Sequence, residues 1–363
     1  MQERRIHNFN AGPATMPLPV LERAREEMVN YKSSGMSVME MSHRSPQFEK
    51  ILHDTEEKFR KLLGIPADYT VLFLQGGASL QFAMIPMNLR PEGSADYILT
   101  GYWSNKAHKE AKLLGSTQVI ATSEESGFDR IPLVSSENQN PDAAFLHITS
   151  NETIQGIKWT TEPPCTNGIP LVSDMSSNIA SRPIDVNKYG LIYAGAQKNL
   201  GPAGVTAVIV RNDLLDRSLD NLPSMLNYKK LAKEGSMYNT PPTYGIYMIG
   251  LVLDWLIENG GLDKIGALNK EKSGLVYQAI DVSNGFYKGH AQPQDRSHMN
   301  VVFTLKNDAL TQQFIEASQK ERFVGLKGHK SIGGVRASLY NALPIEAVQS
   351  LVEFMKEFQR TNG

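Results

Sequence analysis

One lysine of the sequence stands in a setting that suits covalent chemistry. Lys198 lies in the run AGAQKNLGPAG at 194–204, which directly follows an apolar strand pattern at 191–194. A lysine at the end of a buried strand loses hydration, so the pKa of its amine falls and it becomes a nucleophile toward an aldehyde. The alternative is a solvated lysine in a glycine-rich loop, and this segment does not separate the two interpretations.

An aspartate follows a second apolar strand pattern. Asp174 comes directly after residues 171–173, so we expect its carboxylate to face the same crevice as Lys198. Pyridoxal phosphate (PLP) carries an aldehyde and needs an anion beside its pyridine nitrogen, because a protonated ring accepts carbanion electrons better. Asp174 fits that role, although an aspartate at a strand end also often caps a helix. The two residues together indicate PLP chemistry.

Three further segments offer groups that a phosphorylated ring would need. The run QGGAS at 75–79 places Ala78 and Ser79 at a helix start, where backbone amides and the helix dipole favour an anion. Trp103 offers a flat face for stacking, and Thr153 offers a hydroxyl for the ring oxygen. Each has a plainer interpretation: a tight glycine turn, a core tryptophan or a turn-capping threonine. Their shared position is stronger evidence for a cofactor site than any one of them, because all of them follow successive predicted strands.

The elements that must position these residues alternate between short strands and helices from about residue 70 to 211. This pattern predicts an α/β protein with a mainly parallel central sheet flanked by helices, whose ligands bind beyond the carboxyl ends of the strands. After about residue 266 the pattern changes to a smaller α+β unit. We expect an N-terminal segment (1–15), a large cofactor-binding domain (16–262) and a small C-terminal domain (263–363).

Composition limits the partners. With 363 residues, 37 basic and 38 acidic side chains and 41% hydrophobic residues, the chain is typical of a globular protein with no attraction to nucleic acid or membranes. The lone Cys165 has no partner and no metal-ligand spacing, so we expect a reduced, cytoplasmic setting and no metal. The start of the chain has no apolar core of a secretory signal. The apolar stretch 244–257 is too short to span a membrane and is predicted to be a buried helix.

Over essentially its whole length, the sequence resembles the phosphoserine aminotransferases, a family of fold-type-I PLP enzymes of the class-V group. The resemblance rests on NFNAGP at 8–13, SHRS at 42–45, QGGAS at 75–79, SDMSS at 173–177, GAQKN at 195–199 and YNTPP at 238–242. It implies transfer of the amino group from L-glutamate to 3-phosphohydroxypyruvate in serine biosynthesis. Some members of the family also act on the related phosphorylated precursor of pyridoxine.

The resemblance also implies roles for individual residues. Lys198 would hold one PLP per subunit as a Schiff base and serve as the proton carrier, while Asp174 would pair with the pyridine nitrogen. The implied cofactor contacts are Ala78, Ser79, Trp103, Thr153 and Gln197, with Asn239 and Thr240 reaching the phosphate of the neighbouring subunit's cofactor. The implied substrate contacts are Arg336 for the α-carboxylate and His43, Arg44 and His329 for the distal anion. A homodimer with shared active sites follows from this resemblance.

Other functions are alternatives to this one. A cysteine desulfurase needs a mobile cysteine, which Cys165 between Pro164 and Thr166 does not resemble. An aminotransferase for unphosphorylated substrates would differ only in the distal pocket. A dinucleotide-binding or Walker-type protein is disfavoured because no Gly-x-Gly-x-x-Gly and no Walker lysine follow the first predicted strand. A PLP-binding protein without turnover remains a further alternative.

Overall fold

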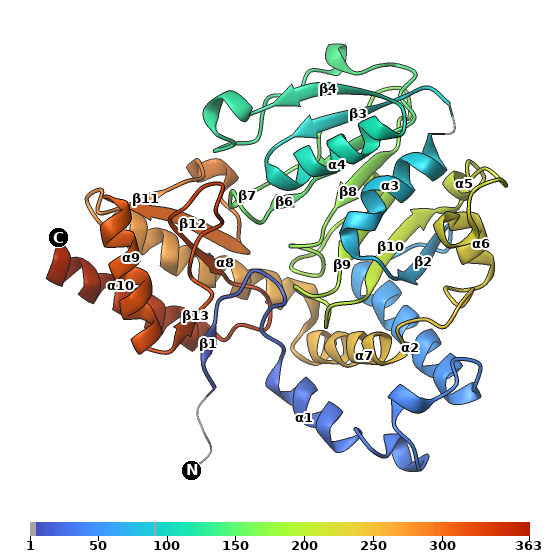
Figure 1. The fold of residues 1–363 in the computed structure, drawn as a ribbon, viewed down its shortest axis with the longest axis horizontal. Coiled ribbons are helices and arrows are strands. Elements are labelled where there is room, and N and C mark those ends of the chain that lie inside the picture. The colour runs from blue at the N-terminus through green and yellow to red at the C-terminus, as the bar shows by residue number, and fades with distance from the viewer. Residues whose placement is uncertain (1–4, 91) are drawn as a thin grey trace.

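A central sheet with helices on both faces forms the larger part of the molecule (Figure 1). The computed structural model describes residues 5–90 and 92–363, so the first four residues of the predicted N-terminal segment lie outside it. Within the described residues, seven strands make up this sheet. In spatial order they are β2 (Tyr69–Leu74), β10 (Thr206–Arg211), β9 (Leu191–Gly195), β8 (Leu171–Asp174), β5 (Leu146–Thr149), β3 (Ser94–Leu99) and β4 (Ser116–Thr122).

The sheet is mainly parallel, as predicted, and β10 is the strand that departs from this direction. It pairs antiparallel with both of its neighbours, β2 and β9. A parallel return needs a crossover of about a dozen residues or more, usually a helix. Only the short segment 196–205, which includes Lys198, connects β9 to β10. Lys198 therefore lies in the loop that connects the two antiparallel strands β9 and β10.

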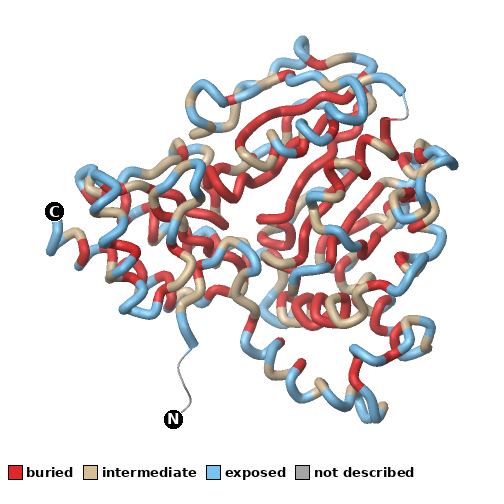
Figure 2. Tube along the Cα trace, viewed as in Figure 1, coloured by how far each residue is buried: buried red, intermediate tan, exposed pale blue. Residues whose placement is uncertain are grey.

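Side chains alternate between the two faces of the sheet, and both faces are buried. On β9, Leu191 and Tyr193 join the core under helices α3 (Gly77–Leu89) and α4 (Tyr102–Leu113). Ile192 joins the opposite core, with α2 (Pro46–Leu63) and α7 (Thr243–Glu258). Burial on both faces explains the nearly continuous apolar runs of these strands. Figure 2 shows the central strands as mostly buried backbone.

Helix α2 begins and ends at residues that favour helix termini. In α2, the Ser45 hydroxyl accepts the backbone N–H of Phe48, Pro46 occupies the first turn, and Gly64 ends the helix with φ of 65°. These are standard signals for a helix start and stop. Helix α7 contains the predicted apolar stretch and is largely buried. No helix within the described residues is long and apolar enough to cross a membrane.

A second hydrophobic core belongs to the C-terminal part of the chain. Its elements are α8 (Gly261–Asp281), β11 (Tyr287–Gly289), β12 (Asn300–Leu305), α9 (Asp308–Lys320), β13 (Phe323–Val324), β14 (Val335–Ser338) and α10 (Ile345–Asn362). The N-terminal strand β1 (His7–Asn8) pairs with β13, and Phe9 is buried in this core. The N-terminal segment therefore packs on the C-terminal unit. The predicted boundary at 262/263 falls in the first turn of α8 and stays a prediction.

The remaining elements are short connections around the large unit. They are α1 (Leu18–Glu26), β6 (Asn151–Glu152), β7 (Ile157–Lys158), α5 (Asn212–Leu215) and α6 (Tyr228–Lys233). The pair β6 and β7 is an antiparallel hairpin that extends past the carboxyl end of β5. It therefore lies beside the edge of the sheet at which the predicted site residues gather.

Candidate active site

Lys198 lines a cavity at the carboxyl ends of the strands. Its Nζ donates a hydrogen bond of 2.7 Å to the Thr153 hydroxyl. Burial lowers the pKa of Lys198, Asp174 and Glu152 oppose this shift, and the charge of Arg336 adds to it, which together bring the pKa to about 8. At pH 7 about a tenth of these amines are therefore uncharged and able to attack a carbonyl carbon.

Asp174 ends β8 and is buried, with 6% of its surface exposed. Its Oδ1 accepts the backbone N–H of Ser176 at 2.8 Å. Burial raises the pKa of Asp174, while the hydrogen bonds from Ser176 and the charge of Lys198 oppose that shift. The cavity thus holds a buried carboxylate that a cationic ring nitrogen would stabilise.

The glycine turn at 76–77 opens a helix toward the same cavity. Gly76 and Gly77 have φ of 88° and 67°, which only glycine adopts readily, and a Cβ on Gly76 would collide with the side chain of Leu80. Ala78 and Ser79 follow in the first turn of α3, and both line the cavity. The N–H groups of a first helical turn have no partners inside the helix, so they are available to an anion.

Trp103 is held by a residue that sequence reasoning missed. Glu152 is fully buried, and its carboxylate accepts the backbone N–H groups of Trp103 and Ser104 at 3.0 and 2.9 Å. Burial raises the pKa of Glu152, and these hydrogen bonds oppose the rise. The Trp103 ring centroid lies 5.8 Å from Lys198 Nζ. A carboxylate from the β6 hairpin thus fixes the N-terminus of α4 and with it the position of the tryptophan.

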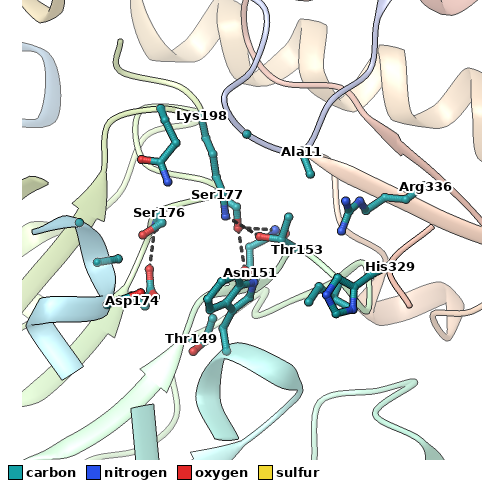
Figure 3. A pocket seen from close by; sticks show the side chains of 17 residues that line it. Ala11, Thr149, Asn151, Thr153, Asp174, Ser176, Ser177, Lys198, His329 and Arg336 are labelled. Carbon is teal, nitrogen blue, oxygen red and sulfur yellow. Dashed lines mark hydrogen bonds between the residues drawn. The ribbon is translucent and has the colours of Figure 1, made fainter. Parts of the chain in front are cut away.

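Arg336 and His329 reach the cavity from the C-terminal unit, on the side opposite Asp174 (Figure 3). The Arg336 guanidinium is partly buried, its Nε has no hydrogen-bond partner, and it forms no salt bridge with any carboxylate in the described part of the chain. Burial lowers the pKa of Arg336. The His329 ring packs on Tyr102 at 5.3 Å. An unpaired guanidinium facing a cavity is a receptor for a carboxylate or phosphate.

These side chains enclose a cavity of about 310 Å³. It unites the predicted residues Ala78, Ser79, Trp103, Thr153, Asp174, Gln197, Lys198, His329 and Arg336. Sequence reasoning did not single out the other lining residues, which are Ala11, Gly12, Gly77, Thr149, Asn151, Ile154, Ser176 and Ser177. Of these, Ala11 and Gly12 lie in the NFNAGP run, Gly77 lies in QGGAS, and Ser176 and Ser177 lie in SDMSS, so the sequence carried a usable signal for them. Thr149, Asn151 and Ile154 lie at or just after β5, and only the fold brings them to the cavity.

Four predicted residues do not line this cavity within one chain. Asn239 and Thr240 are exposed, and the backbone carbonyl of Thr240 accepts a hydrogen bond from the Gln75 side chain at 3.3 Å. Arg44 is exposed, and His43 is half-buried with its Nε2 lacking a partner. One chain does not bring these four residues to the cavity, so their predicted roles stay predictions.

Comparison with known proteins gives consistent similarities over the whole chain. The model of the family "Aminotransferase class-V" matches residues 6–351. The phosphoserine aminotransferase of Geobacillus kaustophilus is 53% identical over 358 residues, covering 98% of this chain and 99% of that protein. The solved structure of phosphoserine aminotransferase from Bacillus circulans subsp. alkalophilus superposes with a TM-score of 0.96 at 52% identity, covering 99% of each chain.

Proposed function

This chain belongs to the class-V aminotransferases and, among them, to the phosphoserine aminotransferases, and we propose that it transfers the amino group of L-glutamate to 3-phosphohydroxypyruvate. The products are 2-oxoglutarate and O-phospho-L-serine. The observation that carries the proposal is the buried Lys198, whose amine shares one cavity with Asp174 and the unpaired Arg336.

The cavity fits pyridoxal phosphate by the chemistry of its donors and acceptors. Asp174 supplies a buried anion for the pyridine nitrogen, and Trp103 supplies a flat face. Thr149 has a buried hydroxyl without a partner, which leaves a polar atom free for a ligand in this cavity. Ala78 and Ser79, in the first turn of α3, would hold the phosphate. Lys198 would link one cofactor per subunit as a Schiff base.

When bound, the cofactor supplies an electron sink that stabilises the negative charge left on the substrate α-carbon. The chain's own contribution centres on Lys198. Once its amine is free, Nζ can accept the proton that leaves the α-carbon, because its lowered pKa brings it close to working pH. Thr153, at 2.7 Å from Nζ, orients the amine. Replacing Lys198 should remove both the covalent link and the proton carrier.

The cationic side of the cavity would recognise both substrates. Arg336 can hold the α-carboxylate through two parallel hydrogen bonds, which its planar guanidinium suits better than a lysine would. His329 would contact the distal group, which is a carboxylate in glutamate and a phosphate in phosphoserine. His43 and Arg44, which lie outside the cavity of a single chain, would add to this contact. Hydrogen-bond donors that bind either a carboxylate or a phosphate explain how one pocket serves two substrates.

A homodimer with shared active sites is part of the proposal. Asn239 and Thr240 are exposed near Gln75, which immediately precedes the glycine turn of the predicted phosphate site. Because both are exposed and do not line the cavity of their own chain, they are available to contact a cofactor phosphate in a neighbouring copy. We also propose that the enzyme is cytoplasmic, which fits its lone cysteine. We also propose that the enzyme forms 4-phosphohydroxy-L-threonine in pyridoxine biosynthesis, because this product carries a distal phosphate as O-phospho-L-serine does.

Comparison of two amino donors tests the substrate assignment. With 2-oxoglutarate as acceptor, O-phospho-L-serine should give a kcat/KM at least about a hundredfold above that of L-serine, because charge-assisted hydrogen bonds to the phosphate are lost with serine. Equal values would favour the alternative of an aminotransferase for unphosphorylated substrates. Lys198→Ala should abolish turnover, and Lys109→Ala, at an exposed position on α4, is the matched control.

A further inference from the structure

A second cavity lies behind the active site, between the two units of the chain. It encloses about 280 Å³. Asn151 lines both cavities, so a single side chain separates them at this point. The other lining residues are Lys158, Asn178, Ser181, Arg182, Pro183, Asp263, Gly266, Ala267, Asn269, Lys270, His298 and Met299. They come from the β6–β7 hairpin, the segment after β8, helix α8 and the start of β12.

The charge of this cavity is positive overall. Lys158, Arg182 and Lys270 face one acidic lining residue, Asp263. None of the three cations forms a salt bridge with a carboxylate among residues 5–90 and 92–363. Three like charges around one hollow repel each other, so an anion between them would be stabilised.

His298 also lines this cavity. Burial, together with the charges of Lys158, Lys270 and Arg182, lowers the pKa of His298 to about 4. The same three cations therefore act on a single imidazole at the wall of the cavity. His298 Nδ1 is 2.9 Å from the Ser273 hydroxyl, which leaves the opposite ring nitrogen without a hydrogen bond to the described chain.

Asn269 supplies a second, independent sign of a ligand. It is 1% exposed, and its Nδ2 donates to the Ser181 carbonyl and to Asn341 Oδ1 at 3.0 and 2.8 Å. Its Oδ1 is buried and has no hydrogen-bond partner among the described residues. A buried carbonyl oxygen without a donor costs free energy. Because Asn269 lines the cavity, a ligand with a hydroxyl or ammonium group would supply the missing donor.

Two short hydrogen-bond chains connect this cavity to the active site. Asn178 Oδ1 accepts the Ser150 hydroxyl at 2.6 Å, and the same hydroxyl contacts the backbone carbonyl of Asp174 at 2.9 Å. Asn151 Nδ2 donates to the Ser177 hydroxyl at 2.8 Å. Both chains end on the segment that carries the buried carboxylate. A ligand in the second cavity would therefore contact the residues that position Asp174.

We propose that the second cavity is a binding site for a small phosphate ester or carboxylate that also carries a hydroxyl or ammonium group. The anionic group of the ligand lies among Lys158, Arg182 and Lys270. The hydroxyl or ammonium group of the ligand donates a hydrogen bond to Asn269 Oδ1. A concave site of this volume suits a small molecule better than an acidic side chain of another protein. This inference does not rest on the transamination proposed above.

Calorimetric titration of the holoenzyme with glycerol 3-phosphate tests the proposal. This probe has a phosphate and hydroxyl groups but neither an amino nor a keto group, so it cannot be transaminated. We expect two classes of site per chain, one in the active site and one in the second cavity. Lys270→Ala and Lys158→Met should each weaken one class by at least about tenfold, as expected for loss of a charged hydrogen-bond donor, while leaving the other unchanged.

Lys264→Ala is the matched control, because Lys264 is exposed on the same helix as Lys270 but does not line the cavity. It should leave both classes unchanged. Lys270 is itself exposed, so its replacement removes charge without disturbing a core. A single class in the wild type, or two classes that Lys270→Ala and Lys158→Met both leave intact, would overturn the proposal. Equal binding of sulfate at the second site would reduce it to nonspecific anion attraction and also overturn it.

Discussion

Replacing Glu152 by glutamine perturbs the position of Trp103 without removing volume. The carboxylate of Glu152 accepts two buried backbone N–H groups in the first turn of α4. A glutamine amide keeps one oxygen and points an N–H toward the other donor. One buried N–H then loses its partner, which costs about 1–3 kcal/mol. Loss of a negative charge at the helix N-terminus adds about 0.3–1 kcal/mol, and relief from burying a charge offsets part of the sum.

We therefore expect Glu152→Gln to lower the free energy of unfolding by about 1–3 kcal/mol, measured by urea denaturation of the apo-protein. Because the same N–H groups fix Trp103, the dissociation constant of pyridoxal phosphate should rise about tenfold, equivalent to about 1.4 kcal/mol. Glu110→Gln, at an exposed position of α4, should change neither quantity. If Glu152→Gln matches the wild type in both stability and cofactor affinity, our account of how Trp103 is positioned is incorrect.

Three further predictions follow from the charged groups. In the apo-protein at pH 7.5, about a quarter of the Lys198 amines should be neutral, against about one in a thousand for an ordinary lysine. Reductive methylation followed by mass spectrometry should therefore find that Lys198 is labelled far faster than exposed lysines. Arg336→Lys should raise the KM for glutamate at least about tenfold by losing one of two parallel hydrogen bonds, and an unchanged KM would exclude this carboxylate contact. Lys272 is buried, donates to the carbonyls of Tyr340 and Leu343, and has its pKa lowered by burial to about 7. The unfolded chain then binds more protons, so stability should rise with pH between about 7 and 10 by up to about 1.4 kcal/mol per unit, a rise that Lys272→Met should remove when unfolding is measured across that range.

The sequence was informative wherever the pattern of burial decides the structure. Apolar runs ended by polar or glycine residues correctly predicted the central strands and the buried helix at 244–257. The gathering of Lys198, Asp174 and Trp103 around one cavity follows from the parallel strands, whose carboxyl ends meet at one edge. The direction of β10 was not predicted, because periodicity does not distinguish a hairpin partner from a crossover strand.

Long-range polar contacts lay beyond sequence reasoning. Glu152 meets the N-terminus of α4 because a two-residue strand extends past β5, and nothing in the order of residues marks that approach. The second cavity combines Lys158, Arg182 and Lys270 from segments far apart in the chain. Each of these residues looks like an ordinary surface charge by itself. Only their placement around one cavity indicates that they could bind an anion together.

The central claim is most directly tested by the absorption spectrum of the holoenzyme during the two half-reactions. L-Glutamate is added first, and 3-phosphohydroxypyruvate is added after glutamate has been removed. The account predicts that the yellow band of the lysine-linked cofactor bleaches with glutamate, returns with the phosphorylated keto acid and never forms in Lys198→Ala. A band that bleaches but does not return would contradict the assigned acceptor. A protein that stays colourless with added pyridoxal phosphate would contradict the account as a whole.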